Sequence, residues 1–568
     1  MKLSRFRRIT QATTFLLFIV IFLFTQYPNA TKFPLDAFLR LDPLVAVVAM
    51  IGARALITTM LWAGILLVLT LVVGRFFCGY VCPLGTLIDF SDFAFFGKKH
   101  KKETVDPKPN RRVKYFVLIG VVAASLLGAN FLAFFSPLSI APRVFTHVLF
   151  PPLLWLLTGT TDLLRPLLVN MGFDVFTELD FGRVYFDTGI ATAVFFAVII
   201  GANYFRKRFW CRYVCPTGAF LSLFSRFGVF KRKVSDSCID CKLCMSKCDM
   251  RAVDSDPRNT ILSECTLCGD CQDACKKGST TFGMAGFGFG KLNARLNVGR
   301  RTFIQSTAAG LLLAATVKAG IQSFKNIQGR FIRPPGSLPE SEFLARCIRC
   351  GECMKVCKTN TLQPADLETG FEGLWTPHHI MRHAPCEKEC NMCGYVCPTQ
   401  AIRALPLEEK KFVKIGTVVI DRHRCIAWEQ EKLCLICAEI CPFNAIEMRI
   451  VDNFRGMFKR PFVVEDKCTG CGYCEKACPV YGRSAIEVYS IGEERKRSGS
   501  YITETKKKLR EVHDMHESTY DADLMGSGGA GAPSGSPSSV VPKAPPTSPA
   551  AAPARPAPVE ELPKGFTD

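Results

Sequence analysis

The chain has 568 residues, 28 of them cysteine, and a formal net charge of +21. Its length predicts several domains. Many cysteines favour disulfides in a secreted protein and a strong positive charge favours nucleic-acid binding, but the positions of both residue types argue against these two classes. Twenty-four cysteines form six quartets and the other four form two matching pairs, so none is left over.

Residues 1–233 predict an all-α membrane unit of four helices. The chain opens with a basic stretch, Met1 to Arg8, followed by an apolar run. We interpret this run as an uncleaved first helix, because no small-residue cleavage site precedes Pro28. Four apolar runs are each long enough to cross a hydrocarbon core of about 30 Å. They cover residues 13–24, 55–73, 115–135 and 188–204.

Charge is distributed unevenly between the loops of this unit. Residues 98–114 and residues 206–233 each contain eight Lys or Arg, whereas the loops after the first and third helices have few basic residues. Basic loops tend to stay in the cytoplasm, so both ends of the unit are expected there, and no nucleic acid is needed to explain the charge. The acidic residues of the opposite loops include Asp162, Asp174, Glu178 and Asp180.

The membrane unit contains an internal repeat. Residues 75–85 match residues 208–218 at eight of eleven positions, and each copy carries the pattern C-x3-C-P. Cysteines four residues apart share one face of a helix. The two pairs are predicted to supply four thiolates to one metal centre or to form a dithiol redox couple, and a cysteine-proline turn that only ends a helix is the alternative. The cysteines are Cys78, Cys82, Cys211 and Cys215.

Residues 234–281 contain two quartets with the spacing C-x2-C-x2-C-x3-C. In bacterial ferredoxins this spacing places three thiolates around one [4Fe-4S] cluster and sends the fourth to the neighbouring cluster. We therefore expect a two-cluster ferredoxin, and it should face the cytoplasm because the preceding helix ends there. Its predicted ligands are Cys238, Cys241, Cys244, Cys248, Cys265, Cys268, Cys271 and Cys275.

A glycine-rich linker, residues 282–298, leads to residues 299–324, where a pair of basic residues again precedes an apolar run. The paired arginines before Thr302 and Phe303 resemble a twin-arginine export signal. The apolar run reaches spanning length if it extends to Phe324. A basic-flanked helix that docks within a soluble protein is the alternative. Clusters are assembled in the cytoplasm, so an exported cluster-bearing domain must cross folded, and the next domain is expected in the periplasm.

Residues 325–490 contain four further quartets, which predict four [4Fe-4S] clusters in two ferredoxin-like pairs. Short β-type runs, residues 418–421 and 462–464, lead into two of them. Zinc ribbons remain an alternative, although they usually separate two CxxC pairs by a dozen or more residues. The first quartet is expected to pair with the fourth and the second with the third, as in other four-cluster subunits. The predicted ligands are Cys347, Cys350, Cys353, Cys357; Cys386, Cys390, Cys393, Cys397; Cys425, Cys434, Cys437, Cys441; and Cys468, Cys471, Cys474, Cys478.

The rest of the chain offers weaker signals. Residues 491–568 form a tail that is charged and partly helical over 491–516 and disordered over 526–563. No phosphate loop, dinucleotide fingerprint or C-x-x-C-H haem motif is present. The remaining candidates are histidines and one arginine. His378, His379 and His383 are expected in a solvated loop rather than at a metal, and Arg143 and His147 as an ordinary interfacial pair rather than a quinone contact.

Two families resemble the two halves of the chain. Residues 1–281 are similar to the NapH/MauN membrane ferredoxins, the quinol dehydrogenase membrane components associated with periplasmic nitrate reductase and methylamine dehydrogenase. Residues 299–490, with Arg333-Pro334-Pro335-Gly336 and Cys347-Ile348-Arg349-Cys350-Gly351, resemble the NapG/MauM exported four-cluster ferredoxins. The resemblance implies oxidation of menaquinol or ubiquinol and delivery of electrons to a periplasmic enzyme.

Together these features predict a multi-pass protein of the bacterial inner membrane. Its fold should combine an all-α four-helix transmembrane unit, α+β ferredoxin-like domains and a fifth, twin-arginine segment. We expect six [4Fe-4S] clusters, quinol as substrate, and a periplasmic oxidoreductase or c-type cytochrome as acceptor. The alternative is a factor that donates electrons during maturation of a periplasmic redox enzyme.

Overall fold

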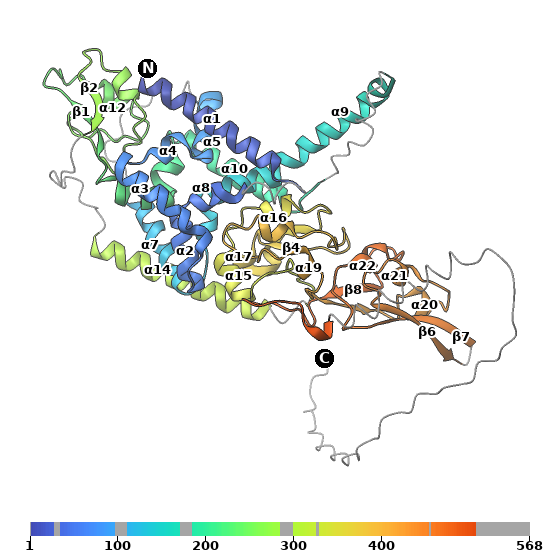
Figure 1. Ribbon diagram of the computed structural model, residues 1–568. Helices are drawn as coiled ribbons and strands as arrows, with labels where there is room; N and C mark the ends of the chain where they lie inside the picture. Colours follow the sequence, from blue (N-terminus) through green and yellow to red (C-terminus); the bar gives the residue numbers. More distant parts are fainter. Residues whose placement is uncertain are drawn as a thin grey trace, which may run out of the picture. The chain divides into compact units, whose positions relative to one another are not determined.

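The computed structural model describes residues 2–27, 35–96, 111–170, 184–284, 299–324, 329–453 and 456–506 (Figure 1). Residues 1–510 form one structural unit. The predicted disordered segment 526–563 and most of the predicted linker lie outside the described residues.

The helices and turns of the N-terminal part lie between Leu3 and Ser225, within the described residues 2–27, 35–96, 111–170 and 184–225. Its core is apolar and rich in aromatic contacts, such as Phe18 against Phe145 with ring centroids 5.2 Å apart. The elements are α1 Leu3–Phe24, η2 Leu35–Leu41, α2 Pro43–Ala53, η3 Thr58–Trp62, α3 Ala63–Val73, α4 Phe76–Tyr80, α5 Pro83–Ser91, η4 Asp92–Phe96, α7 Arg112–Leu126, η5 Leu132–Phe134, α8 Pro137–Val144, η6 Phe145–Leu149, α9 Phe150–Asn170, α10 Gly189–Gly201, η8 Ala202–Tyr204, η9 Trp210–Val214 and α11 Pro216–Ser225.

The expected set of four uninterrupted helices is too simple. The run over residues 55–73 is divided between η3 and α3, and the run over 115–135 ends as α7 at Leu126, two residues before Gly128 with φ of 76°. A glycine with positive φ ends a helix because the left-handed conformation cannot continue it. Hydropathy counts apolar residues and does not locate such breaks.

A second difference lies after α7, where an acidic loop was expected. Helices α8, η6 and α9 follow one another from Pro137, and Asp162 lies within α9. Among the described residues, Leu3–Phe24 and Pro137–Pro166 are the two helices long and apolar enough to cross a membrane. Shorter apolar helices cover Pro43–Ala53, Thr58–Val73 and Gly189–Tyr204.

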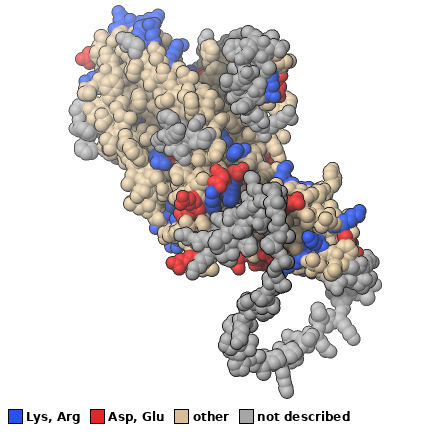
Figure 2. All heavy atoms as spheres, turned by 45° about the vertical axis from the view of Figure 1, so that its right-hand side comes forward, with Lys and Arg blue, Asp and Glu red and all other residues tan. Residues whose placement is uncertain are grey.

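Several of these helices present apolar side chains to the outside. On α10, Ile190, Val194 and Val198 follow one another at intervals of four, which places them on one face, and all three are exposed. The outer faces of α1 and α3 are similar. In Figure 2, a broad surface without charged residues separates Lys and Arg at the upper end from mixed charges at the lower end. Exposed apolar surfaces of this extent mark contact with a membrane or a partner.

A small ferredoxin-like module follows α11. Strands β1, Phe230–Val234, and β2, Thr280–Met284, pair antiparallel, and the cysteine loops between them carry the short helices α12, Leu243–Ser246, and α13, Asp270–Asp273. The module begins four residues earlier and ends three residues later than expected, because each boundary residue lies inside a paired strand.

Helix α14 is a single helix, Arg300–Phe324, as the apolar run within residues 299–324 predicted. It packs along α7, and the two helices approach closely at Gly310 and Gly120, where a Cβ on Gly310 would overlap the Gly120 carbonyl. Small residues at a crossing let two helix backbones approach each other closely.

The C-terminal part consists of short helices and three two-stranded antiparallel sheets, β3–β4, β5–β8 and β6–β7. Two predicted β-type runs fall in strands β5 and β7. The elements are α15 Glu340–Arg346, α16 Glu352–Lys355, β3 Leu362–Pro364, η10 Leu367–Thr369, α17 Gly370–Gly373, β4 Pro377–His379, α18 Met392–Tyr395, α19 Leu407–Lys410, β5 Thr417–Ile420, α20 Ile426–Glu429, α21 Ile436–Glu439, β6 Ile446–Asn453, β7 Gly456–Val463, α22 Tyr473–Ala477 and β8 Ile486–Tyr489.

The charged segment after β8, which was expected to be partly helical over residues 491–516, packs back onto this domain over its described residues 491–506. Within the described part of the segment, a helical turn occurs only at residues 504–506. Tyr501 is fully buried, and Arg495 forms an ion pair with Glu340 at 2.5 Å. Glu340 also pairs with the buried Arg333 at 2.6 Å.

Replacing Glu340 with glutamine is expected to destabilise the protein by about 3 kcal/mol, because Arg333 would keep its buried charge and lose its carboxylate. Burial desolvates the Glu340 carboxyl, but Arg333 and Arg495 outweigh this effect and lower its pKa to about 2. The carboxyl is ionised above its unfolded pKa of about 4.3, so the stabilisation is complete there and is lost only as the pH falls towards the folded pKa.

Thermal unfolding measured at pH 7 and at about pH 5.5 should therefore show the same difference between the wild type and Glu340→Gln. The exposed Glu408 provides the matched control, and Glu408→Gln should stay within about 0.5 kcal/mol of the wild type. A difference that disappears between these two pH values would contradict the role given to the Glu340 carboxylate.

Candidate metal centres

Three cavities in the C-terminal domain are each lined by four cysteines. The Cys347 site has a volume of about 370 Å³, the Cys425 site about 400 Å³ and the Cys468 site about 300 Å³. Each takes three cysteines from one quartet and a fourth from another, as in bacterial ferredoxins. The sets are Cys347, Cys350, Cys353 and Cys397; Cys425, Cys434, Cys437 and Cys478; and Cys468, Cys471, Cys474 and Cys441.

These sets show that the expected pairing of quartets is wrong. The first quartet exchanges its fourth cysteine with the second, and the third exchanges with the fourth. For the second quartet, the pKa of the Cys393 thiol is raised by burial and then by Cys386, Cys390 and Cys357, which places the fourth cysteine of the first quartet beside it. Quartets adjacent in the chain pair because short connections keep consecutive elements adjacent in space.

Strand pairing explains the exchange between the third and fourth quartets. Strand β5 leads into the third quartet and β8 follows the fourth, and the two strands pair from Thr417 with Tyr489 to Ile420 with Ile486. The ends of the two cysteine loops are therefore held together by one sheet.

The cysteine loops depend on glycine at two tight positions. Gly351 has φ of 86° and Gly472 has φ of 83°, in the region that favours glycine. A Cβ on Gly472 would lie 2.6 Å from the sulfur of Met381. A larger residue would both strain the loop and displace its neighbour, so these glycines let the thiols converge.

Burial favours the protonated form of several cysteine thiols when no metal is bound, as at Cys471 and Cys437. It raises the pKa of the Cys471 thiol and of the Cys437 thiol to about 12. Iron would have to displace these protons, so metal binding and proton release are coupled. The donor set suits [4Fe-4S] clusters, which cysteine thiolates hold four at a time.

The ferredoxin-like module shows the same exchange. Burial and then the neighbouring Cys248 raise the pKa of the Cys265 thiol to about 11, so the fourth cysteine of one quartet lies beside the other quartet. The Cys248 sulfur accepts the backbone N–H of Ala252 at 3.1 Å, and the Cys441 sulfur accepts that of Ala445 at 3.3 Å.

The two C-x3-C-P pairs meet at one further cavity, with a volume of about 380 Å³. We call it the four-thiol cavity, and its cysteines are Cys78, Cys82, Cys211 and Cys215. The expectation that each pair shares one helical face is wrong. Cys78 lies in α4 and Cys82 is the N-cap of α5, whereas Cys211 lies in η9 and Cys215 is the N-cap of α11. Each helix breaks before its proline, because a residue that precedes proline avoids the α conformation.

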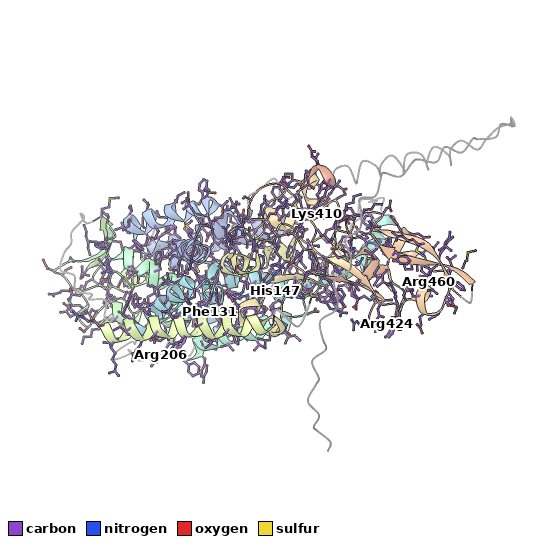
Figure 3. All side chains as sticks on the ribbon, turned by 90° about the horizontal axis from the view of Figure 1, so that it is seen from below. Phe131, His147, Arg206, Lys410, Arg424 and Arg460 are labelled. Carbon is purple, nitrogen blue, oxygen red and sulfur yellow. The ribbon has the colours of Figure 1, made fainter. Side chains whose placement is uncertain are left out.

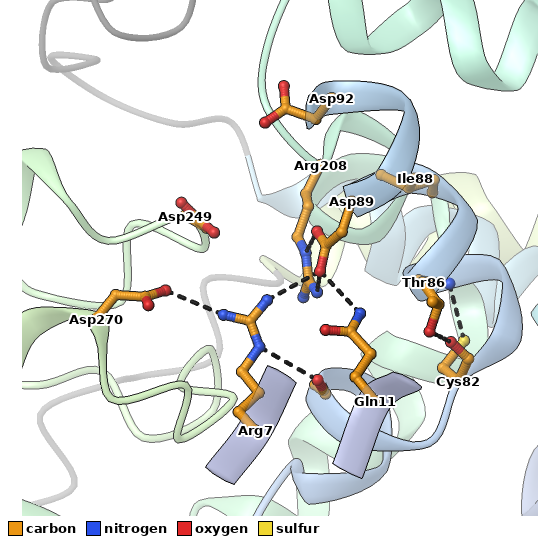
Figure 4. A network of polar contacts seen from close by, with 12 residues as sticks. Arg7, Gln11, Cys82, Thr86, Ile88, Asp89, Asp92, Arg208, Asp249 and Asp270 are labelled. Carbon is orange, nitrogen blue, oxygen red and sulfur yellow. Dashed lines mark hydrogen bonds and ion pairs between the residues drawn. The ribbon is translucent and has the colours of Figure 1, made fainter. Parts of the chain in front are cut away.

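Charged side chains tie the surroundings of this cavity together (Figure 4). Arg208 donates to both carboxylate oxygens of Asp89, at 2.7 Å and 2.5 Å. Arg7 of α1 pairs with Asp89 at 2.9 Å and with Asp270 of the ferredoxin module at 3.0 Å. This network therefore joins α1, α5 and the module.

The histidines and Arg143 are not where they were expected. His378 and His379 lie in strand β4, where His379 is buried and burial lowers its pKa to about 3, so these two residues are not in a solvated loop. His383 lies in the turn after the strand and is partly exposed. Arg143 and His147 are both buried, and His147 is labelled in Figure 3. Arg143 stacks on Trp375, 4.2 Å from the ring centroid, and His147 lies against Gly351.

Disulfide bonds and single metal ions are the other roles that cysteines can have. All 28 carry free thiols, so none forms a disulfide. Among the described residues, no group of three or more His, Cys, Asp or Glu side chains is arranged to hold a single metal ion.

Comparison with known proteins agrees with the geometry. A family model described as a 4Fe-4S binding domain matches residues 55–103 and 188–235, and one described as a 4Fe-4S dicluster domain matches residues 432–481. No solved structure matches.

Curated relatives match about a third of the chain. The methylamine utilization ferredoxin-type protein MauM of Methylorubrum extorquens is 37% identical over 187 residues, which are 32% of this chain and 80% of MauM. The ferredoxin-type protein NapG of Escherichia coli is 35% identical over 209 residues, which are 35% of this chain and 89% of NapG. MauM of Paracoccus denitrificans is 33% identical over 208 residues, 35% of this chain and 90% of MauM. The protein is thus an iron–sulfur electron-transfer protein, and the chain belongs to the ferredoxin-type family that includes MauM and NapG.

Proposed function

We propose that this protein is a membrane-bound quinol dehydrogenase component that passes electrons through [4Fe-4S] clusters to a periplasmic oxidoreductase or c-type cytochrome. The observation that carries the proposal is the joining, in one chain, of cysteine quartets of the ferredoxin kind to helices with exposed apolar faces. Each cluster, when bound, takes up and releases one electron.

The quartets supply the ligands for six such clusters. The two in the ferredoxin-like module, residues 234–281, are assigned to the cytoplasm and the four in residues 325–490 to the periplasm. The protein contributes thiolates, excludes water through burial and places charges around the sites, which together tune the potentials. Oxidation of one quinol releases two electrons and two protons, so two electrons pass on one after the other to the acceptor.

Three features support the membrane assignment. The exposed faces of α1, α3 and α10 are apolar, residues 98–114 and 206–233 are strongly basic, and α14 begins with paired arginines. We therefore assign residues 1–281 to a membrane unit of the NapH/MauN type, fused to a periplasmic domain of the NapG/MauM type. The matches of one family model to both copies of the C-x3-C-P repeat are consistent with this assignment.

The test uses the purified full-length protein, kept free of oxygen in lipid vesicles. A soluble quinol analogue should reduce its clusters, or the matching quinone should oxidise clusters that dithionite has reduced, and electron paramagnetic resonance should follow either change. The direction that proceeds gives the direction of electron flow. Intact clusters that respond to dithionite but to neither quinol nor quinone would overturn the proposal.

Deletion of the gene distinguishes the proposed role from a role in maturation. If the protein supports turnover, the partner enzyme should be complete and active with an artificial electron donor. A partner enzyme that is incomplete, and that purified protein and reductant restore, would favour maturation instead.

A further inference from the structure

The four-thiol cavity resembles the ferredoxin cavities in both size and donors. Its volume of about 380 Å³ lies between those of the Cys468 site and the Cys425 site, about 300 and 400 Å³. Like them, it is lined by four cysteine thiols and by no His, Asp or Glu side chain. Each copy of the repeat supplies two thiols, so neither copy forms the site alone.

The geometry favours a cluster over the other occupants of a four-cysteine site. The four thiols are free, so they do not form two disulfides. Cysteine thiolates hold a [4Fe-4S] cluster four at a time, and four thiols line this cavity as they line each of the three cavities of the C-terminal domain.

Backbone and side-chain charges around the cavity suit an anionic group. The Cys82 sulfur accepts the N–H of Gly85 at 3.4 Å, and the Cys215 sulfur accepts the N–H of Gly218 at 3.2 Å. Both sulfurs thus lie at the N-termini of helices α5 and α11, where negative charge is favoured. The ferredoxin thiols Cys248 and Cys441 accept backbone N–H groups in a similar way.

Each repeat also places one arginine beside the cavity. Arg75 and Arg208 occupy equivalent positions in the two copies, and both are buried. Arg75 lines the cavity, and its Nε has no hydrogen-bond partner among the described residues. Arg75 is paired with Glu264 and Arg208 with Asp89, and a cluster with four thiolate ligands would bring further negative charge close to these guanidinium groups.

One side of the four-thiol cavity touches a cysteine loop of the ferredoxin module. Gly79 and Tyr80 lie between Cys78 and Cys82, and Thr266 and Leu267 lie between Cys265 and Cys268. A Cβ on Gly79 would lie 2.9 Å from the Thr266 carbonyl oxygen, and the Tyr80 hydroxyl donates to the Leu267 carbonyl at 2.7 Å. The loops that carry the two sets of thiols are therefore in direct contact.

The other side connects to the Cys347 site through residues 130–137. Pro137 lines the four-thiol cavity, as does Trp210, whose ring stacks on Phe135 with centroids 6.3 Å apart. At the far end of the segment, the Asn130 side chain donates to the Cys347 carbonyl at 3.3 Å.

Arg349 closes the connection. Its guanidinium donates to the Asn130 carbonyl at 2.8 Å and lies over the Phe134 ring, 4.5 Å from the centroid. Arg349 stands between two cysteines of the Cys347 site. One short segment therefore contacts the surroundings of both cavities.

We propose that Cys78, Cys82, Cys211 and Cys215 hold a further [4Fe-4S] cluster, and that it relays electrons between the ferredoxin module and the Cys347 site. Each transfer oxidises one cluster by one electron and reduces its neighbour by one, and no bond forms or breaks. The relay rests on the proposed electron-transfer function, whereas the cluster site does not. The relay would join the two sets of quartets into one path.

Iron content and native mass spectrometry of the full-length protein test the site. The wild type should contain about 28 irons, and the double variant Cys78→Ala/Cys215→Ala about 24, since each cluster holds four. The mass should fall by one Fe4S4 unit. Cys474→Ala is the matched control and should lose one cluster from the C-terminal domain. A wild-type protein with only six clusters would overturn the proposal even if the variants fail to fold.

Freeze-quench electron paramagnetic resonance tests the relay. A reductant that cannot cross the membrane, added on the side of the ferredoxin module, should reduce the C-terminal clusters in the wild type and fail to do so in Cys78→Ala/Cys215→Ala. Gly79→Val should keep every cluster and slow the transfer, because its side chain pushes Thr266 away. The control Gly283→Val, which meets only the Lys233 side chain, should leave the rate unchanged.

Wild-type transfer rates in the double variant would overturn the relay. That result would not contradict the proposed quinol oxidation, because the experiment on quinol oxidation measures reduction of the clusters by quinol and not by the reductant used here.

Discussion

Replacing Glu264 with glutamine is expected to destabilise the folded protein by about 3 to 5 kcal/mol, the usual cost of leaving a buried charge without its partner. The Glu264 carboxylate accepts from Lys114 at 2.6 Å and from Arg75 at 3.1 Å. All three side chains are almost completely buried. Glutamine keeps the shape and one acceptor but removes the negative charge, so two cations remain buried without it.

The position of Glu264 gives this change a local consequence. Glu264 immediately precedes Cys265 of the ferredoxin module, whereas Lys114 lies in the first turn of α7 and Arg75 precedes α4. The ion pairs therefore fasten the module to the helices. We expect the module to be released from the helices first, and its clusters to be lost at a lower temperature than those of the C-terminal domain.

Thermal unfolding in detergent, followed by the visible absorbance of the clusters, measures the effect. The exposed Asp236 lies in the same module, and Asp236→Asn should stay within about 0.5 kcal/mol of the wild type. Lys114→Met combined with Glu264→Gln should recover part of the loss, because an apolar side chain removes one of the unpaired charges. Equal unfolding temperatures for Glu264→Gln and Asp236→Asn would show that the buried pairs do not hold the module.

The spacing of residues in the sequence is sufficient to predict local structure, such as cysteine loops, single strands and single helices. The C-x2-C-x2-C-x3-C spacing predicts loops that bring thiols together, and four-cysteine cavities lie at these loops. The β-type run at residues 418–421 coincides largely with β5, since a short continuous run of β-branched residues favours a strand. The helix from Arg300 to Phe324 likewise follows from a weakly apolar run, which had to be extended past Lys318 to reach this length.

Spacing does not predict contacts between distant segments. The exchange of cysteines between quartets depends on which strands pair, and Glu264 finds Arg75 across 189 positions of the chain. One signal for this contact was present in the repeat, where an arginine precedes each C-x3-C-P pattern by the same distance. Such an arginine indicates a buried charge that requires a partner, although it does not name the partner.

Helix breaks were missed for a different reason. Cysteines four residues apart suggested one helical face, but Pro83 and Pro216 each start a new helix directly after the second cysteine. Proline is favoured at the first position of a helix. The break turns Cys82 and Cys215 into N-cap residues, which is how two short patterns come to face a shared cavity.

Replacing Cys478 with alanine is expected to remove the cluster of the Cys425 site and to leave the Cys347 site intact. Cys478 belongs to the fourth quartet but lines the cavity of the third. The protein should lose about four irons. Alanine is chosen over serine because a hydroxyl can replace the thiolate as a ligand.

Alkylation of the native protein, followed by peptide mass mapping, identifies the cysteine thiols that become exposed when a cluster is lost. In Cys478→Ala the newly labelled cysteines should be Cys425, Cys434 and Cys437, whereas Cys397→Ala should expose Cys347, Cys350 and Cys353. Pairing of the first quartet with the fourth would instead expose the Cys347 set in Cys478→Ala. The two variants remove the last cysteine of a quartet in the same way, so the difference between them depends only on which quartets exchange ligands. The order of the clusters along the domain, and with it the path that an electron can take, follows from that exchange.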